Sequence, residues 1–222
     1  MKAFSMVNGS ILDGIPPLFP VDFFNLSADI PYSKTFLSKK NFSRSHFLPS
    51  TSALLNETSF ADLKLAWNEE GLLVQVFARK PFEESFYPHF SGGDSLELFF
   101  DTRDLKTAGF AGRFCHHFVV LISEIQGIRA LEMTRFRTED AHPLCESQEI
   151  HIETKYESNA YQLQVCIPSS CLHGYDPAFF DRLGFTYRLN RPKKAPQHFA
   201  VSSRHYAIEQ HPALWASLKL VK

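Results

Sequence analysis

The chain lacks an excess of charge of either sign, and this limits its partners. Lys and Arg number 23 against 24 Asp and Glu, for a formal net charge of -1. Without a strong positive field, nucleic acid is a poor partner. The pairs Lys39-Lys40 and Lys193-Lys194 are too short to be basic tracts and are typical of solvated loops. We therefore expect no nucleic-acid binding.

Long hydrophobic runs are also missing. No stretch has the length of a membrane span, and the first ten residues contain one Lys and no apolar run of signal-peptide length. The prolines in residues 16–20 break any continuation of such a run. We therefore expect no secretory signal, no membrane insertion and, by default, a cytoplasmic location.

Cysteine is scarce, with 4 copies, and none of them forms a CxxC pair. Cys166 and Cys171 are too far apart for a redox pair and have no second half of a zinc site. We expect free or buried thiols, with a Cys166–Cys171 bridge as the alternative in an oxidising compartment. The GxSxG, HExxH, P-loop and Rossmann glycine motifs are absent as well, so the sequence predicts a protein that is not an enzyme.

Phe is abundant, with 22 copies, and it favours strands and a wide core between two sheets. From about residue 60, short segments of alternating apolar and polar residues are separated by turns. This pattern predicts an all-β, antiparallel sandwich. The expected strands cover residues 62–68, 72–78, 94–101, 114–122, 128–137, 149–156, 161–167, 183–190 and 215–221.

Residues 1–58 differ from the rest of the chain. They are rich in Pro, Ser, Asn and Phe and show little periodicity. Because Pro cannot donate to a β-ladder, this segment is expected to be a loop-rich arm with at most short edge strands. Its aromatic residues argue against free disorder. We expect the arm to pack on a sandwich formed by residues 59–222.

Three segments resemble the family 9 carbohydrate-binding and DOMON-like domains. They are the Trp-bearing hairpin of residues 65–76, the acidic strand of residues 93–104, and the two final strands, residues 183–190 and 215–220. The resemblance covers roughly residues 60–222. It implies a jelly-roll-like sandwich that binds a carbohydrate or related polar ligand. The alternatives are a structural or protein-interaction sandwich, and a haem- or metal-binding redox domain.

Trp215 is the first candidate ligand-binding residue. Leu218 and Leu220 alternate with Ser217 and Lys219, so the period of two sends Trp215 to the polar face of its strand. A Trp on that face either stacks on a sugar ring or lies beneath the N-terminal arm. The sequence leaves these two possibilities open.

The other candidates are polar residues that suit sugar hydroxyls or anions. Arg135 and Arg137 share one face of an expected strand, and Arg188 and Asn190 share a face of another. If these strands are neighbours, the arginines line one patch, although a solvated face is the alternative. His116 and His117 are adjacent in an expected strand, so their side chains point to opposite faces. His117 is either a half-buried, hydrogen-bonded histidine or, with Cys115, a metal ligand.

Asp101 and Asp104 end an expected strand. Two carboxylates beside backbone carbonyls are a tentative calcium site, because calcium takes six to eight oxygen ligands. The alternative is turn chemistry, in which each carboxylate accepts hydrogen bonds from nearby backbone N–H groups.

Overall fold

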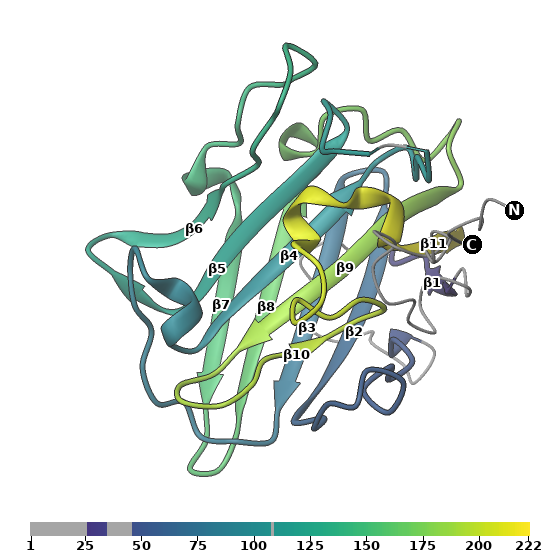
Figure 1. Ribbon diagram of the computed structural model, residues 1–222. Helices are drawn as coiled ribbons and strands as arrows, with labels where there is room; N and C mark the ends of the chain where they lie inside the picture. Colours follow the sequence, from purple (N-terminus) through teal and green to yellow (C-terminus); the bar gives the residue numbers. More distant parts are fainter. Residues whose placement is uncertain (1–25, 35–45, 108) are drawn as a thin grey trace, which may run out of the picture.

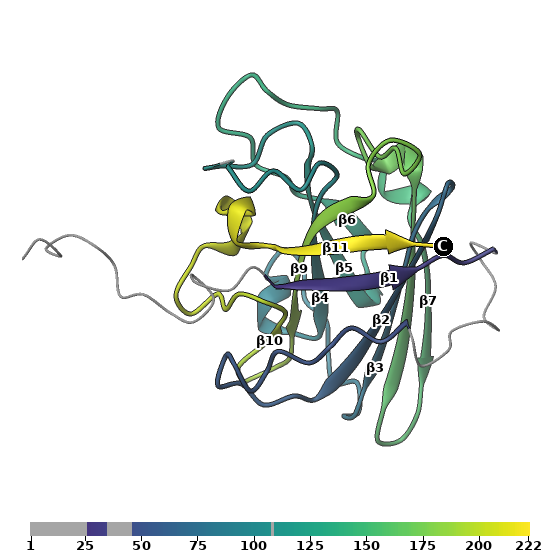
Figure 2. The same cartoon turned by 90° about the vertical axis from the view of Figure 1, so that its right-hand side faces the viewer.

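The computed structural model describes residues 26–34, 46–107 and 109–222, which form two β-sheets packed face to face (Figures 1 and 2). We call them the front sheet and the back sheet. In the part of the chain described, no helix is long and apolar enough to cross a membrane. The all-β sandwich predicted from the sequence is confirmed.

The front sheet is 7-stranded, with the order β1-β11-β9-β4-β5-β6 and with β10 paired to β9. Its pairs are antiparallel except for β1 and β11, which run parallel. The bounds are β1 (Ser27–Pro31), β11 (Ala216–Val221), β9 (Arg182–Asn190), β4 (Ser95–Asp101), β5 (Cys115–Ile125), β6 (Ile128–Glu132) and β10 (Gln197–His198).

The back sheet is 4-stranded and antiparallel, with the order β2-β3-β8-β7. Its strands are β2 (Ala61–Asn68), β3 (Gly71–Ala78), β8 (Tyr161–Pro168) and β7 (His151–Tyr156). Short 3-10 turns lie in the connections: η2 (Phe90–Gly92), η3 (Ser147–Glu149), η4 (Ser169–Cys171), η5 (Ile208–Gln210) and η6 (Pro212–Leu214).

Alternation along each strand builds the core. On β4, Leu96, Leu98 and Phe100 point to the interior between the sheets and are fully buried. Phe99 points the other way, into a second apolar cluster on the outer face of the front sheet. Successive side chains of a strand point to opposite faces, so one strand serves both clusters.

One edge of the sandwich is closed by the chain ends. β1 pairs with β11, and the next residue, Tyr32, bridges to Trp67 of the back sheet. The Trp67 ring nitrogen donates to the carbonyl of Val221 at 3.3 Å, and its ring lies edge-on to Tyr32 at 5.2 Å. Figure 2 shows β1 and β11 running across the gap between the two sheets.

The expected strands agree with the observed ones, with three differences. The segment predicted over residues 128–137 ends as β6 at Glu132, and β1 and β10 were not predicted as strands. β1 belongs to the predicted arm, and it is held by pairing with β11. Most of the arm, residues 1–25 and 35–45, lies outside the described residues, so the proposed domain boundary at residue 58 stays a prediction.

The cysteine prediction was wrong in its pairing. Cys145 and Cys171 form a disulfide, whereas Cys115 and Cys166 are buried thiols outside it. Cys145 lies in the connection after β6, and Cys171 lies in η4. The spacing of the cysteines along the sequence did not predict that these two segments meet. Disulfides are typical of oxidising compartments, and the cytoplasmic location stays a prediction.

Candidate functional site

The outer face of the front sheet carries three of the polar residues that the sequence singled out: His117, Arg188 and Asn190. Figure 1 looks onto this face, with β5, β4 and β9 side by side. Glu97 of β4 pairs with Arg188 of β9 on one side and with Val119 of β5 on the other. Because Glu97 alternates with Leu96 and Leu98, its side chain points outward and not into the main core.

Four side chains form what we call the Glu97 network: Glu97, His117, Arg188 and Asn190. The Arg188 Nε and Nη2 atoms donate to the two carboxylate oxygens of Glu97 at 2.6 Å each. The Asn190 amide donates to Oε1 at 2.8 Å, and His117 Nε2 lies 2.9 Å from Oε2. A two-pronged arginine pair of this kind fixes both partners in orientation.

Electrostatics hold the network in its charged form. The Glu97 carboxylate is fully buried, which by itself would raise its pKa, but hydrogen bonds from His117 and Arg188 lower the pKa to about 2. Burial alone would lower the pKa of Arg188, yet the hydrogen bonds and charge of Glu97 raise it. The side chains of Arg188 and His117 remain 18% and 12% exposed, so the network reaches solvent at these two residues.

A segment between β10 and β11 borders the network. Its η5 and η6 turns, drawn in yellow, pass over β4 (Figure 1). Glu209 of η5 acts on the Arg188 pKa by its charge, and its Oε2 atom is buried with no hydrogen-bond partner. The neighbouring Gln210 accepts a hydrogen bond from Arg137. Glu209 therefore lies near Arg188, and Arg137 contacts the residue that follows Glu209.

The structure brings Arg137 to this patch by a route the sequence did not predict. β6 ends at Glu132, so Arg135 and Arg137 lie in the following connection and are exposed, not on a strand. β6 and β9 are separated by β4 and β5, which corrects the idea that neighbouring strands would align the arginines. Arg137 reaches Gln210 through the loop instead, whereas Arg135 is exposed in the connection itself.

Trp215 lies on the outer side, as its alternation with Leu218 predicted, but it is only 2% exposed. Its ring nitrogen donates to the Ile208 carbonyl at 2.8 Å, and it packs on Phe99 and Val201. The chain between β10 and β11 covers it. Trp215 therefore supports the floor of the patch and does not offer an open stacking surface, which corrects the sugar-stacking expectation.

His117 is the half-buried, hydrogen-bonded histidine of the sequence alternatives. Its ring stacks on Phe99 with the centroids 4.3 Å apart. Burial raises the pKa of the Cys115 thiol to about 12, so Cys115 is a poor metal ligand beside it. His116 points to the opposite face, as expected from the period of two.

The geometry at Asp101 and Asp104 favours turn chemistry over calcium. The Asp101 carboxylate accepts hydrogen bonds from the backbone N–H groups of Arg103 and Leu105, at 2.9 and 2.7 Å. Asp104 accepts a hydrogen bond from the Ser217 hydroxyl and pairs with Lys106, both at 2.6 Å. Donors from the chain thus already surround the oxygens that calcium would need.

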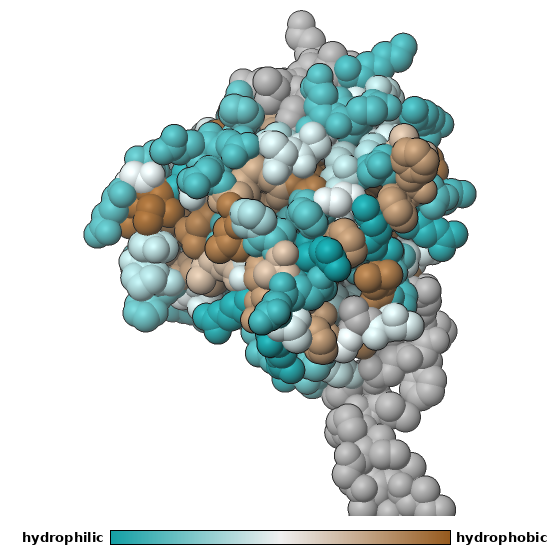
Figure 3. All heavy atoms as spheres, turned by 90° about the horizontal axis from the view of Figure 1, so that it is seen from above, coloured by the Kyte–Doolittle hydropathy of each residue, from teal (hydrophilic) through white to brown (hydrophobic). Residues whose placement is uncertain are grey.

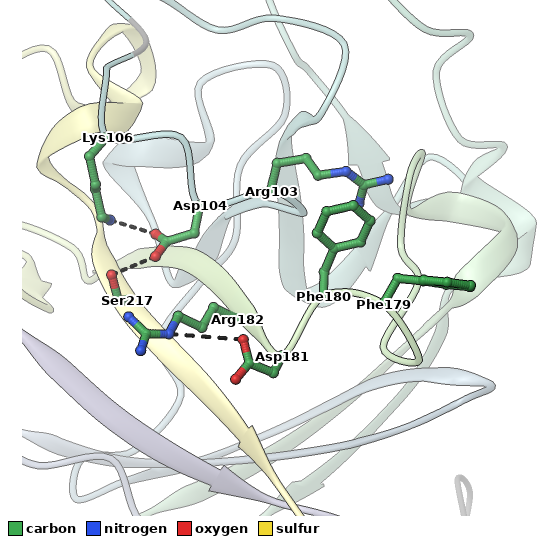
Figure 4. A pocket seen from close by; sticks show the side chains of 8 residues that line it. All are labelled: Arg103, Asp104, Lys106, Phe179, Phe180, Asp181, Arg182 and Ser217. Atoms are coloured by element: carbon green, nitrogen blue, oxygen red, sulfur yellow. Dashed lines mark hydrogen bonds and ion pairs between the residues drawn. The ribbon is translucent and has the colours of Figure 1, made fainter.

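A hollow of about 380 Å³ opens at the end of the sandwich beside this turn. Seen from that end, apolar and polar residues are interspersed (Figure 3). Phe179 is 83% exposed, and the Arg103 guanidinium lies over the Phe180 ring at 3.7 Å. Figure 4 shows Asp104 between Lys106 and Ser217 on the opposite wall. This hollow is a second place where a polar ligand with an apolar face would fit.

Comparison with known proteins identifies the fold. A family 9 carbohydrate-binding module from Caldicellulosiruptor kristjanssonii in complex with cellotriose matches with a TM-score of 0.60 at 17% identity, covering 88% of this chain and 93% of that chain. A family 9 module from the same organism in complex with glucose matches with a TM-score of 0.61 at 17% identity, covering 87% and 95%. No family model and no curated protein match the sequence.

The family 9 part of the predicted resemblance is thereby confirmed at the level of the fold, whereas the DOMON-like part gains no support. The sequence reasoning found His117, Arg188 and Asn190, which the structure brings together. It missed Glu97 as the centre of the network, although a carboxylate in the middle of an apolar strand was a visible signal. It also missed Glu209, because no pattern in the sequence predicts that η5 packs over β4.

Proposed function

We propose that this chain is a non-catalytic carbohydrate-binding module whose ligand lies on the outer face of the front sheet. The ligand would contact the exposed tips of Arg188 and His117, with Arg137 and Glu209 at the rim. The observation that carries the proposal is the Arg188 guanidinium, which Glu97 orients through two hydrogen bonds and which keeps 18% of its side chain exposed on this face.

Sugar hydroxyls suit this arrangement because each of them both donates and accepts hydrogen bonds. The carboxylates of Glu97 and Glu209 balance the guanidiniums of Arg188 and Arg137. A patch of balanced charge favours a neutral polyol over an anionic ligand. The fold likeness to modules in complex with glucose and cellotriose supports the same ligand class.

Calorimetric titration of the full chain with glucose and with cellotriose tests the proposal. We expect binding of at least one of them, weakened about 10-fold or more in Glu209→Ala and Arg137→Ala, since a hydrogen bond to a charged group contributes about 1.5–3 kcal/mol. Phe179→Ala, at the separate hollow, is the matched control and should bind as the wild type does.

Two outcomes would overturn the proposed site. If neither sugar binds at millimolar concentration, the carbohydrate function is wrong for these ligands. If Phe179→Ala abolishes binding while Glu209→Ala and Arg137→Ala leave it intact, the sugar binds in the hollow lined by Phe179 and Phe180. Thermal melts of each variant separate lost binding from lost folding.

The alternatives predict different behaviour. A haem-binding domain would be coloured after purification, and His117 is a poor haem ligand because its Nε2 is hydrogen-bonded to Glu97 Oε2. A protein-interaction sandwich would bind neither sugar in the calorimetric titration. Absorption spectra of the purified full chain and the sugar titrations distinguish these two from a sugar-binding module.

A further inference from the structure

A buried cluster of three metal-ligating side chains lies apart from the Glu97 network. We call it the His–Glu–His cluster: His116 of β5, Glu132 at the end of β6 and His142 in the connection to β7. His116 and Glu132 both point inward, because His117 and Leu131 next to them point outward. One potential ligand atom from each of the three residues lies within 4.8 Å of the others.

The ring nitrogens of the two histidines face only oxygen acceptors. His142 Nδ1 lies 2.8 Å from the Pro143 carbonyl, and its Nε2 lies 3.2 Å from the Cys115 carbonyl and 3.4 Å from Glu132 Oε1. His116 Nδ1 lies 2.9 Å from Glu132 Oε1, and its Nε2 lies 3.5 Å from the His173 carbonyl.

A neutral imidazole has one donor nitrogen and one acceptor nitrogen. In this cluster, each neutral ring would therefore turn a lone pair toward an oxygen that also has only lone pairs to offer. A metal cation between His116 Nδ1, His142 Nε2 and Glu132 Oε1 removes the conflict.

The spacing suits a small divalent metal. Zinc binds nitrogen and carboxylate oxygen at roughly 2.0–2.2 Å, so tetrahedral ligands lie about 3.4 Å apart. The distances from Glu132 Oε1 to the two ring nitrogens are 2.9 and 3.4 Å. Two histidines and one carboxylate are a ligand set that holds zinc and leaves a fourth position for water.

Surrounding groups already orient the ligands. The backbone N–H of Cys145 donates to Glu132 Oε2 at 2.7 Å, and the Thr134 hydroxyl donates to Oε1 at 2.7 Å. The Pro143 carbonyl accepts from His142 Nδ1, which leaves Nε2 as the ligand atom. Hydrogen bonds of this kind, from groups around a metal site, fix the tautomer and orientation of its ligands.

We propose that His116, Glu132 and His142 form a site for a divalent transition metal of the zinc type. The metal would join the ends of β5 and β6 to the connection that carries Cys145 of the disulfide. The site is enclosed within the sandwich, and it is independent of the sugar-binding proposal.

Zinc alone is the probe. The full chain, without a histidine tag, is stripped with a chelator and titrated with zinc chloride by calorimetry. We expect one zinc per chain, a rise in Tm on zinc addition, and the visible absorption of a four-coordinate site when cobalt(II) replaces zinc. Glu132→Gln and His142→Gln should weaken zinc binding at least about 100-fold, and Thr134→Val, which removes an orienting bond, about 10-fold. His151→Gln, an exposed histidine on β7, is the matched control and should be unchanged.

The wild-type titration decides the matter even if the ligand variants fail to fold. No zinc bound at micromolar concentration, together with a Tm that chelator and zinc leave unchanged, would overturn the proposal. Zinc binding that survives in folded Glu132→Gln or is lost in His151→Gln would also overturn it, because the metal would then lie elsewhere.

Discussion

Arg188 of β9 lies directly opposite Glu97 of β4 in the sheet register, and it donates to both carboxylate oxygens at 2.6 Å. The pair is largely shielded from water, since the Glu97 side chain is fully buried. A buried ion pair contributes little relative to an apolar pair, but removing one partner leaves an uncompensated charge. The outer face therefore depends on Glu97 and Arg188 together.

Replacing Glu97 by Ala should lower the free energy of unfolding by about 3–5 kcal/mol, because Arg188 then keeps a buried charge without its partner. Urea denaturation measures the loss. Glu124→Ala, an exposed acidic position on the same sheet, is the control and should change stability by less than about 0.5 kcal/mol. A loss in Glu97→Ala as small as that of the control would contradict the account of the network.

The same carboxylate predicts a pH dependence. Its pKa is about 2 in the folded chain against an ordinary value of 4.5, so the unfolded state binds the proton more readily. The stabilisation by Glu97 is present above pH 4.5 and declines as the pH falls toward the folded pKa of about 2. Urea denaturation over this range should show a steeper decline for the wild type than for Glu97→Gln. Parallel curves for the two proteins would rule out the mechanism.

The cysteines give a chemical prediction. The disulfide joins Cys145 to Cys171, and Cys115 and Cys166 remain thiols. Unfolded chain should therefore react with thiol reagents at two positions before reduction and at four afterwards. In the folded chain the two free thiols should react slowly, because burial raises the pKa of Cys115 to about 12 and that of Cys166 to about 11.

Removing the disulfide with Cys171→Ser should lower the free energy of unfolding by about 3 kcal/mol, because the unfolded chain regains the conformational entropy that a closed loop of this length removes. Denaturation with and without reductant measures the effect, and Cys166→Ser tests a buried thiol outside the bridge. Four reactive thiols in the unreduced, unfolded chain would show that the bridge does not form.

Trp215 should behave as a core residue. Truncation by Trp215→Ala should lower the free energy of unfolding by about 3–5 kcal/mol, as for other buried aromatic side chains. Trp67 is buried as well, so acrylamide should quench little of the fluorescence of the native chain. A fully stable Trp215→Ala variant with strong quenching in the wild type would show that the segment between β10 and β11 does not cover Trp215.

Much of the fold could be predicted because burial leaves a period of two in each strand. The hairpin of β2 and β3 and the acidic strand β4 followed from that alternation and from the turns between them. β1 could not be predicted in this way, since its pairing with β11 joins residues about 190 apart along the chain. β10 has two residues, too few for a period to appear.

For the site, the sequence by itself determined which side chains point out of a strand. Alternation in β4, β5 and β9 places Glu97, His117 and Arg188 on one side of their strands, because a pleated backbone leaves successive side chains no other direction. Only the tertiary structure decided that these strands are neighbours, that the chain after β10 covers Trp215, and that His142 meets His116 and Glu132. Those contacts join distant segments, and their formation depends on the burial and hydrogen bonding of the whole sandwich.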